Sequence, residues 1–161
     1  DNQKKWQIKS SAFWLMERNI SSLIYNKALD ILSRREHSKK ELRLKLSKKF
    51  EDTEEIIEVI DRLESNNLLN DFRFAELYVS MRKRKGFGPN RISYELLNKG
   101  IKDSVSNQII IAENGWEDAA LKVFNKKYKA GVSKDFKIKS KQKNFLQNRG
   151  FGFKEIESVF G

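Results

Sequence analysis

Hydrophobic residues recur at spacings of three and four along most of the chain, and this period is typical of amphipathic α-helices. Ile24, Ala28 and Ile31 follow it near the start, and Phe74 and Tyr78 follow it in the middle. Strict apolar–polar alternation is scarce, and the chain contains a single proline. These patterns predict an all-α protein.

The best-defined stretch covers residues 71–101 and predicts two helices joined by a glycine-proline turn. Asp71 is a candidate N-cap for the first helix. Gly86 can adopt the left-handed conformation that ends this helix. Pro89 suits the first turn of the second helix, where its missing amide hydrogen has no helical partner to lose. We expect Phe74, Leu77, Tyr78 and Met81 to share the buried face of the first helix.

Residues 21–69 give the same arrangement with different end signals. Ser38 and Glu41 have the spacing of a capping box, in which each side chain accepts from the other residue's backbone amide. Asp52 or Thr53 caps a third helix that buries Ile57 among other residues, and this helix stops near Asn66. Residues 103–114 supply the third helix of the second unit, with Asp103 as the expected cap.

Equivalent helix ends recur at nearly constant intervals, which predicts a tandem repeat. The chain reads Lys48-Lys49-Phe50, Lys99-Gly100-Ile101 and Arg149-Gly150-Phe151 at separations of 51 and 50 residues. We therefore expect three three-helix repeats, at residues 21–69, 70–115 and 116–161, stacked into an elongated, curved body. In the third repeat, a basic helix from Phe136 to Arg149 is expected to bury Ile138.

Residues 1–20 precede the repeats and are expected to form an N-terminal arm or a short helix. Phe13, Trp14, Leu15 and Met16 are too apolar for a solvated tail, so we expect them to pack onto the first repeat. An arm that binds a partner is the alternative.

Charge is the strongest compositional feature, because the chain carries a net charge of +11. The net charge is +2 over residues 1–70, +4 over residues 71–100 and +5 over residues 101–161. A surplus of this size attracts polyanions such as nucleic acid, an acidic protein surface or an anionic membrane face. Its position predicts that repeats 2 and 3 carry the binding surface.

The sequence offers little for catalysis, metal binding or cofactor binding. Cysteine is absent, which excludes disulfides, zinc fingers and thiol chemistry. His37 is the sole histidine and is expected to be an exposed turn residue. The turn Gly86-Phe87-Gly88-Pro89 lacks the lysine and hydroxyl residue of a phosphate-binding loop. We expect a binding protein without enzymatic activity, metal or cofactor.

No apolar run is long enough to span a bilayer, and the first residues lack the apolar core of a signal peptide. The expected location is therefore the cytoplasm, without membrane contact, and the expected state is a monomer.

Two basic clusters are the candidate binding residues. The first lies around the glycine-proline turn and the second along the last basic helix. The candidates are Arg82, Lys83, Arg84, Lys85, Arg91, Lys99, Lys137, Lys139, Lys141, Lys143 and Arg149. In a purely structural interpretation, the Arg82–Lys85 run is only a solvated helix end that complements the helix dipole. Four consecutive cations exceed what a helix end needs, which favours binding of phosphates or acidic residues.

An ordered set of motifs over residues 24–160 resembles the RecX family, the bacterial regulators of the RecA recombinase. The set comprises Arg35-Glu36-His37-Ser38 with Glu41-Leu42, then Asn70-Asp71-Phe72-Arg73-Phe74-Ala75, then Lys85-Gly86-Phe87-Gly88-Pro89 with Ile92 and Glu95-Leu96, then Lys99-Gly100-Ile101, and last Phe145-Leu146-Gln147-Asn148-Arg149-Gly150-Phe151. Asn70 stands where the family often has an acid, and Lys49 where a glycine is common.

This resemblance implies a non-catalytic protein of three three-helix repeats that binds the RecA–DNA filament in its helical groove. It also implies that the protein limits RecA's ATP hydrolysis, strand exchange and co-protease function, and so acts in DNA recombination, repair and the SOS response. Single- or double-stranded DNA is a further expected partner. The alternative is a stand-alone helical protein that binds nucleic acid without sequence preference.

Overall fold

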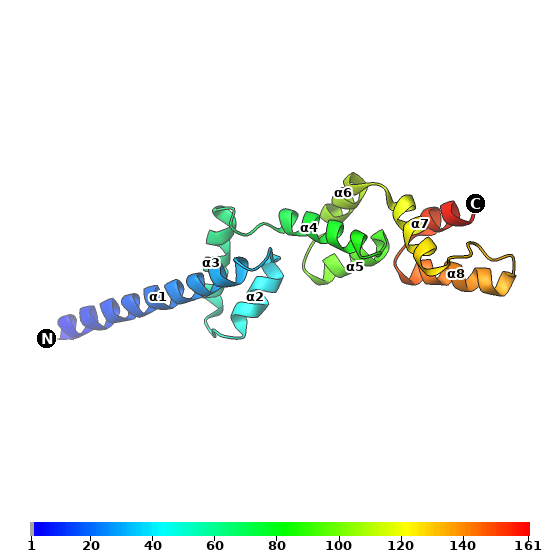
Figure 1. Cartoon of the computed structure of the whole chain (residues 1–161). Helices are drawn as coiled ribbons and strands as arrows, with labels where there is room; N and C mark the ends of the chain where they lie inside the picture. Colours follow the sequence, from blue (N-terminus) through cyan, green and yellow to red (C-terminus); the bar gives the residue numbers. More distant parts are fainter. Residues whose placement is uncertain (1) are drawn as a thin grey trace. The chain divides into compact units, whose positions relative to one another are not determined.

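The computed structural model describes residues 2–161, with side chains described at residue 3 and from residue 11 onward. In this part of the chain the regular secondary structure is all α-helix, without strands (Figure 1). The helices are α1 (Asn2–Leu32), α2 (Lys39–Ser47), α3 (Thr53–Ser65), α4 (Asp71–Arg84), α5 (Pro89–Asn98), α6 (Asp103–Glu113), α7 (Trp116–Lys127), α8 (Phe136–Asn148) and α9 (Phe153–Phe160). They fall into two compact units, residues 1–71 and residues 72–161.

The three helices of the first unit enclose one apolar core. Ile24 and Ala28 of α1 pack with Leu42 and Leu46 of α2, and Leu63 of α3 closes the same cluster. The Ser38–Glu41 capping box that the sequence predicts is present, as is the Asp52 cap of α3. The prediction that Ile57 is buried in this core is wrong. Ile56, Val59 and Ile60 face inward and leave Ile57 half exposed.

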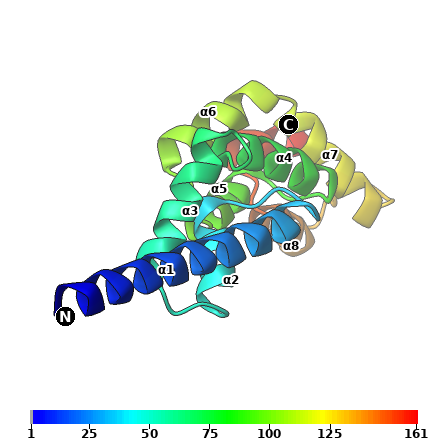
Figure 2. The same cartoon turned by 90° about the vertical axis from the view of Figure 1, so that its left-hand side faces the viewer.

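One continuous helix replaces the arm or short helix expected at the start of the chain. Figures 1 and 2 show the first half of α1 extending beyond α2 and α3. The prediction that Phe13–Met16 pack onto the first repeat is wrong, since these four side chains are 57–60% exposed. Successive side chains of a helix point about 100° apart, so four consecutive apolar residues cannot share one buried face.

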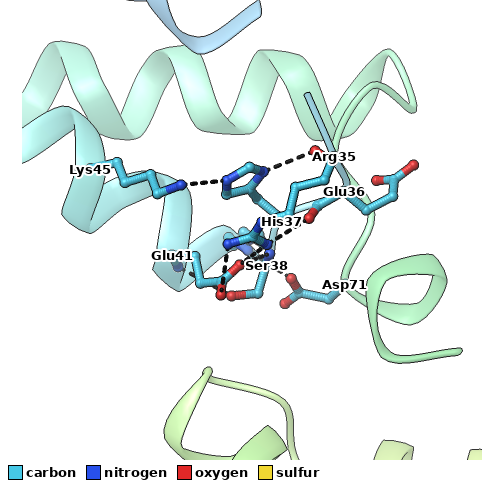
Figure 3. Close-up of polar contacts among 8 residues, drawn as sticks. Arg35, Glu36, His37, Ser38, Glu41, Lys45 and Asp71 are labelled. Carbon is cyan, nitrogen blue, oxygen red and sulfur yellow. Dashed lines mark hydrogen bonds and ion pairs between the residues drawn. The ribbon is translucent and has the colours of Figure 1, made fainter. Parts of the chain in front are cut away.

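His37 is 1% exposed, so the prediction of an exposed turn residue is also wrong. Its Nδ1 lies 2.9 Å from the carbonyl oxygen of Arg35, and its Nε2 lies 2.7 Å from the Nζ of Lys45 (Figure 3). A carbonyl only accepts and an ammonium only donates, so Nδ1 carries the proton and Nε2 accepts. This pair of contacts fits the neutral imidazole. Burial favours the same form, because it lowers the pKa of His37 below its ordinary value.

Asp71 caps a different helix from the one expected. Its carboxylate accepts from the backbone amide of Lys39 at 2.8 Å, in the first turn of α2 rather than of its own helix (Figure 3). Asp71 therefore ties the end of the first unit to the start of α2, beside the capping box. Burial raises the pKa of this carboxyl.

The second unit contains the other two repeats, each with its own core. Phe74, Ala75 and Val79 of α4 pack in the second repeat, and Phe124 of α7 packs with Leu146 in the third. The expected face of α4 is partly wrong, because Leu77 is 56% exposed. The N-cap of α6 is Lys102, one residue before the expected Asp103.

The repeat that the helix ends predict is confirmed. The second helices of the three repeats, α2, α5 and α8, end at the equivalent C-caps Lys48, Lys99 and Arg149. Gly86, Gly100 and Gly150 each take a positive φ after a helix end. The all-α class with three tandem three-helix repeats is therefore established.

Candidate functional site

The glycine-proline turn of repeat 2 docks onto the end of α8 in repeat 3. The backbone amide of Gly88 donates to the carbonyl oxygen of Arg149 at 2.8 Å, and the amide of Asn90 donates to that of Gly150 at 2.9 Å. Neither glycine has room for a side chain, since a Cβ on Gly88 would overlap the backbone of Gly150 and one on Gly150 would lie 2.7 Å from the Arg91 amide nitrogen. The turn thus joins two repeats through their backbones.

Three guanidinium groups surround the Phe87 ring beside this contact. The Cζ of Arg82 lies 3.9 Å from the ring centroid, that of Arg91 4.4 Å and that of Arg149 5.0 Å. Arg82 and Arg91 belong to repeat 2, whereas Arg149 belongs to repeat 3. Cation–π attraction to one ring therefore adds to the backbone contact between the repeats.

Glu95 holds the two arginines of repeat 2 in place. Its carboxylate accepts two hydrogen bonds from Arg82, at 2.7 and 2.9 Å, one from Arg91 at 3.1 Å, and one from the Tyr78 hydroxyl. Burial alone would raise the pKa of Glu95, but the hydrogen bonds from these three side chains outweigh it and leave this pKa lowered. Arg82 is correspondingly committed to an internal ion pair.

Lys83 is also used within the fold. Its ammonium donates to the carbonyl oxygen of Asn114 at 2.6 Å, at the C-cap of α6, and lies 3.5 Å from the Glu113 carboxylate. The Arg82–Lys85 run therefore divides into two halves. Arg82 and Lys83 make ion pairs within repeat 2, whereas Arg84 and Lys85 are exposed and, in the part of the chain that the structure describes, have no carboxylate within 4 Å.

A groove of about 790 Å³ opens beside Arg84 and Lys85, between the end of α4 and the length of α7. We call it the α4–α7 groove. Ala119, Val123 and Phe145 form an apolar part of its lining. The rest of its lining is Ser80, Lys83, Arg84, Lys85, Gly86, Glu113, Gly115, Asp118, Lys122, Lys126, Lys127 and Arg149.

Cations dominate the polar lining of the α4–α7 groove. Seven of the lining residues are lysine or arginine and two are acidic, and one of the two acids, Glu113, is the ion-pair partner of Lys83. The other six cations have no carboxylate within 4 Å among the described residues. Lys127 and Arg149 lie over the Phe145 ring, at 4.3 and 5.5 Å from its centroid. The charges of Arg84, Lys85, Lys122 and Lys126 are available to an anionic partner that enters the groove.

Three of these cations, Lys122, Lys126 and Lys127, were missed by reasoning from the sequence. Lys122 and Lys126 lie on the side of α7 opposite the buried Ala120 and Phe124, whereas Lys127 lies nearer the buried side, with its ammonium 4.3 Å from the Phe145 ring centroid. A signal was present, since Lys122 and Lys126 are four residues apart and therefore share one helical face. What the sequence could not show is that this face lies across a groove from Arg84 and Lys85.

The remaining candidates are spread over other parts of repeats 2 and 3. Lys99 is half-buried with its ammonium 5.4 Å from the Tyr78 ring centroid. Lys143 pairs with Glu157 at 3.3 Å. Lys137 and Lys141 are exposed on α8 and Lys139 is partly buried there, and none of these three lines the groove.

Other kinds of site lack support in the described residues. They contain no group of three or more histidine, cysteine, aspartate or glutamate side chains placed to hold a metal ion. None of the helices described here has the length and apolar content needed to cross a membrane. What the geometry offers is a basic surface for binding.

Comparison with known proteins gives one consistent family. Sequence models of the first, second and third three-helix domains of RecX match residues 25–63, 70–108 and 117–160. The Regulatory protein RecX of Halorhodospira halophila is 35% identical over 140 residues, which are 86% of this chain and 87% of that protein. The Regulatory protein RecX of Acinetobacter baylyi is 40% identical over 124 residues, 77% of each chain.

Solved structures agree with the sequence matches. The crystal structure of RecX from Lactobacillus salivarius has a TM-score of 0.77 at 26% identity, covering 89% of this chain and 96% of that one. A second crystal structure, of a regulatory protein RecX, has a TM-score of 0.83 at 20% identity over 94% of this chain and 77% of that one, and shows the fold alone. With all three domain models matched in order over most of its length, the chain belongs to the RecX family.

Proposed function

We propose that this protein is a non-catalytic regulator that binds the RecA–DNA filament and inhibits RecA's ATP hydrolysis, strand exchange and co-protease function. Family membership supports a regulatory role, since the relatives are named regulatory proteins. In this proposal the basic side of repeats 2 and 3 faces the filament groove, and the protein works in the cytoplasm as a monomer in DNA recombination, repair and the SOS response.

The observation that carries the proposal is the excess of unpaired cations in the α4–α7 groove. A folded protein gains little from gathering cations without carboxylate partners, because like charges repel one another, and this applies to Arg84, Lys85, Lys122 and Lys126. An anionic partner removes this repulsion and is attracted from a distance. The apolar stretch formed by Ala119, Val123 and Phe145 adds a surface that a protein side chain can cover.

Exposure and ion pairing support a choice among the candidate contacts. Arg84, Lys85, Lys122 and Lys126 are exposed and unpaired among the described residues, so they are the proposed contacts. Arg82 and Arg91 share Glu95 and support the docked turn instead. Arg149 takes part in both, since it lines the groove and borders the Phe87 ring.

A second candidate function is sequence-independent binding of nucleic acid without a dedicated protein partner. The same exposed cations support it, because lysines without a fixed geometry suit phosphates in a repeating backbone. The two candidates differ in what the protein needs for its effect. A RecA regulator acts at low ratios to RecA, whereas a simple competitor for DNA must cover the DNA.

A titration into a RecA ATPase assay on single-stranded DNA tests the proposal. We expect inhibition at or below one protein per RecA protomer, and no relief when the DNA is increased severalfold at constant RecA. A control titration measures direct DNA binding at the same salt concentration. Inhibition that appears only when the protein saturates the DNA would support the second candidate, and no inhibition at a stoichiometric ratio would overturn the first.

A further inference from the structure

Residues 129–141 comprise most of the loop between α7 and α8 and the first turns of α8 (Figure 1). Several apolar side chains of this segment are exposed to solvent. Phe136 is 82% exposed, Ile138 is 50% exposed and Val132 is 39% exposed. The expectation that α8 buries Ile138 is therefore wrong. We call this segment the α7–α8 loop. It lies outside the lining of the α4–α7 groove.

The α7–α8 loop is held in place by a buried polar side chain. Gln142 is 3% exposed, and its amide nitrogen donates to the carbonyl oxygen of Gly131 at 3.1 Å. Its amide oxygen accepts from the backbone amide of Ser133 at 3.0 Å. The Asp135 carboxylate then caps α8 by accepting from the amide of Ile138 at 3.1 Å. These contacts hold the backbone on both sides of Phe136 in the conformation that leaves its ring exposed.

Five lysines flank Phe136 along the sequence. Lys129 and Lys134 lie on the loop, and Lys137, Lys139 and Lys141 lie on the first turns of α8. Among the described residues none of the five has a carboxylate within 4 Å. The single acid of the segment, Asp135, is occupied as the cap of α8. The segment therefore combines a protruding aromatic ring with a strong local positive charge.

We propose that the α7–α8 loop binds an unpaired stretch of nucleic acid, with Phe136 stacked on a base and the lysines on the flanking phosphates. Base–aromatic stacking together with a basic track for the backbone is the usual means of holding single strands. A duplex keeps its base faces inside its own stack and exposes only base edges, sugars and phosphates, so a protruding ring finds no base face to stack on. Three partly exposed apolar side chains are too few to anchor the loop in a bilayer.

This contact is separate from the α4–α7 groove and goes beyond the proposed function. The groove has cations from the end of α4 and from α7 together with an apolar lining, whereas the loop has one highly exposed aromatic ring and five lysines. Loss of the loop contact changes the affinity for free single strands, whatever the protein does to RecA. The two proposals can therefore fail independently.

Fluorescence anisotropy of the full-length chain with a labelled single-stranded oligothymidine, and with a duplex of equal length, tests the proposal. Phe136→Ala is expected to weaken single-strand binding about 5- to 100-fold and to leave duplex binding unchanged. Phe136→Leu keeps an apolar side chain but removes the ring, and is expected to lose nearly as much. Lys137→Ala with Lys141→Ala is expected to reduce the salt dependence of binding to both nucleic acids.

Phe153 provides a matched control. It is 81% exposed and opens α9 as Phe136 opens α8, but Lys154 beside it faces Glu117 at 3.5 Å and Glu155 follows it. Phe153→Ala is expected to leave single-strand affinity unchanged. Equal losses for the two variants, no loss for Phe136→Ala, or equal losses on single strand and duplex would each overturn the proposal. So would a Phe136→Leu variant with wild-type affinity, which would show that the ring's plane is irrelevant.

Discussion

The backbone amide of Gly88 donates to the carbonyl oxygen of Arg149 at 2.8 Å, and this bond joins the turn of repeat 2 to the helix end of repeat 3. The glycines of this turn therefore serve the packing of two repeats rather than the binding of a ligand. Because Arg149 also lines the α4–α7 groove, the docked turn fixes one edge of the proposed binding surface. The shape of the groove depends on contacts between repeats.

Gly150→Ala tests this dependence. Gly150 has φ of 99°, and an added Cβ would press on the backbone of Arg91, so both strain and overlap oppose the substitution. We expect the free energy of unfolding of the second unit to fall by about 3 kcal/mol. Chemical denaturation, followed by circular dichroism, measures the change.

Gly131→Ala is the control for backbone strain alone. Gly131 has φ of 83° but no atom within 4 Å of an added Cβ. It should cost only about 1 kcal/mol, the strain of a left-handed residue. Equal costs for the two variants would show that the close approach of Gly150 to Arg91 does not matter.

Glu95→Gln is expected to lower the free energy of unfolding by about 1–3 kcal/mol, because Arg82 then stays mostly buried without its anionic partner. In the wild type the pKa of Glu95 is lowered, so the stabilisation by its charge is present above the ordinary value of 4.5 and is lost as the pH falls through the folded-state pKa. Denaturant midpoints at neutral and acidic pH measure both effects.

Glu117→Gln is the matched control for the loss of one carboxylate. Glu117 faces Lys154 at the surface, where both side chains are well exposed, and exposed pairs contribute little. The expected change is below about 0.5 kcal/mol. If Glu95→Gln were as mild as this control, the hydrogen bonds around Phe87 would not stabilise the second unit.

His37 makes the stability of the first unit depend on pH near neutrality. Burial places its folded-state pKa below the ordinary value of 6.5, so the unfolded state binds more protons between the two values. The positive charges of Arg35 and Lys45 also disfavour protonation of His37, whereas the negative charge of Glu41 favours it. We expect stability to be complete above pH 6.5 and to fall as the pH decreases from there toward the folded-state pKa.

Denaturant midpoints of wild type and His37→Gln between pH 7.5 and 5.5 measure this dependence. His37 is the sole histidine, so the difference between the two curves reports on one residue. The variant is expected to be less stable at pH 7.5 but to lose less on acidification. Parallel curves would mean that His37 has the same pKa in the folded and unfolded states.

Much of the fold follows from local signals in the sequence. The Ser38–Glu41 capping box, the left-handed Gly86 and the N-terminal Pro89 of α5 are short-range features that depend on neighbouring residues alone. The repeated helix ends gave the three repeats for the same reason. The burial of His37 and its contact with Lys45, eight residues away on the next helix, were missed because they arise from packing between helices rather than from neighbouring residues.

The candidate site was only partly predictable from the sequence. Which of its cations are free to bind a partner depends on ion pairs with residues far along the chain. Arg82 and Lys83 look equivalent to Arg84 and Lys85 in the sequence. Their ion-pair partners are Glu95 and Glu113, 13 and 30 residues away, and only the packing of repeat 2 brings these carboxylates close. Local periodicity shows which residues share a helical face but not what that face meets.

The inhibition of RecA's DNA-dependent ATPase by a groove variant tests the central claim most directly. The variant carries Lys85→Ala, Lys122→Ala and Lys126→Ala, which remove three exposed cations from the α4–α7 groove without touching the Phe87 contacts. The control carries Lys40→Ala, Arg43→Ala and Lys48→Ala, which remove the same charge from exposed positions on and beside α2 in repeat 1.

We predict that the groove variant needs at least about tenfold more protein for half-maximal inhibition, because it loses charges that attract and hold the filament. The repeat 1 control should inhibit like the wild type, and both variants should keep the wild-type free energy of unfolding within about 0.5 kcal/mol. Wild-type inhibition by the groove variant, or an equal loss in the control, would contradict the assignment of the α4–α7 groove as the contact surface.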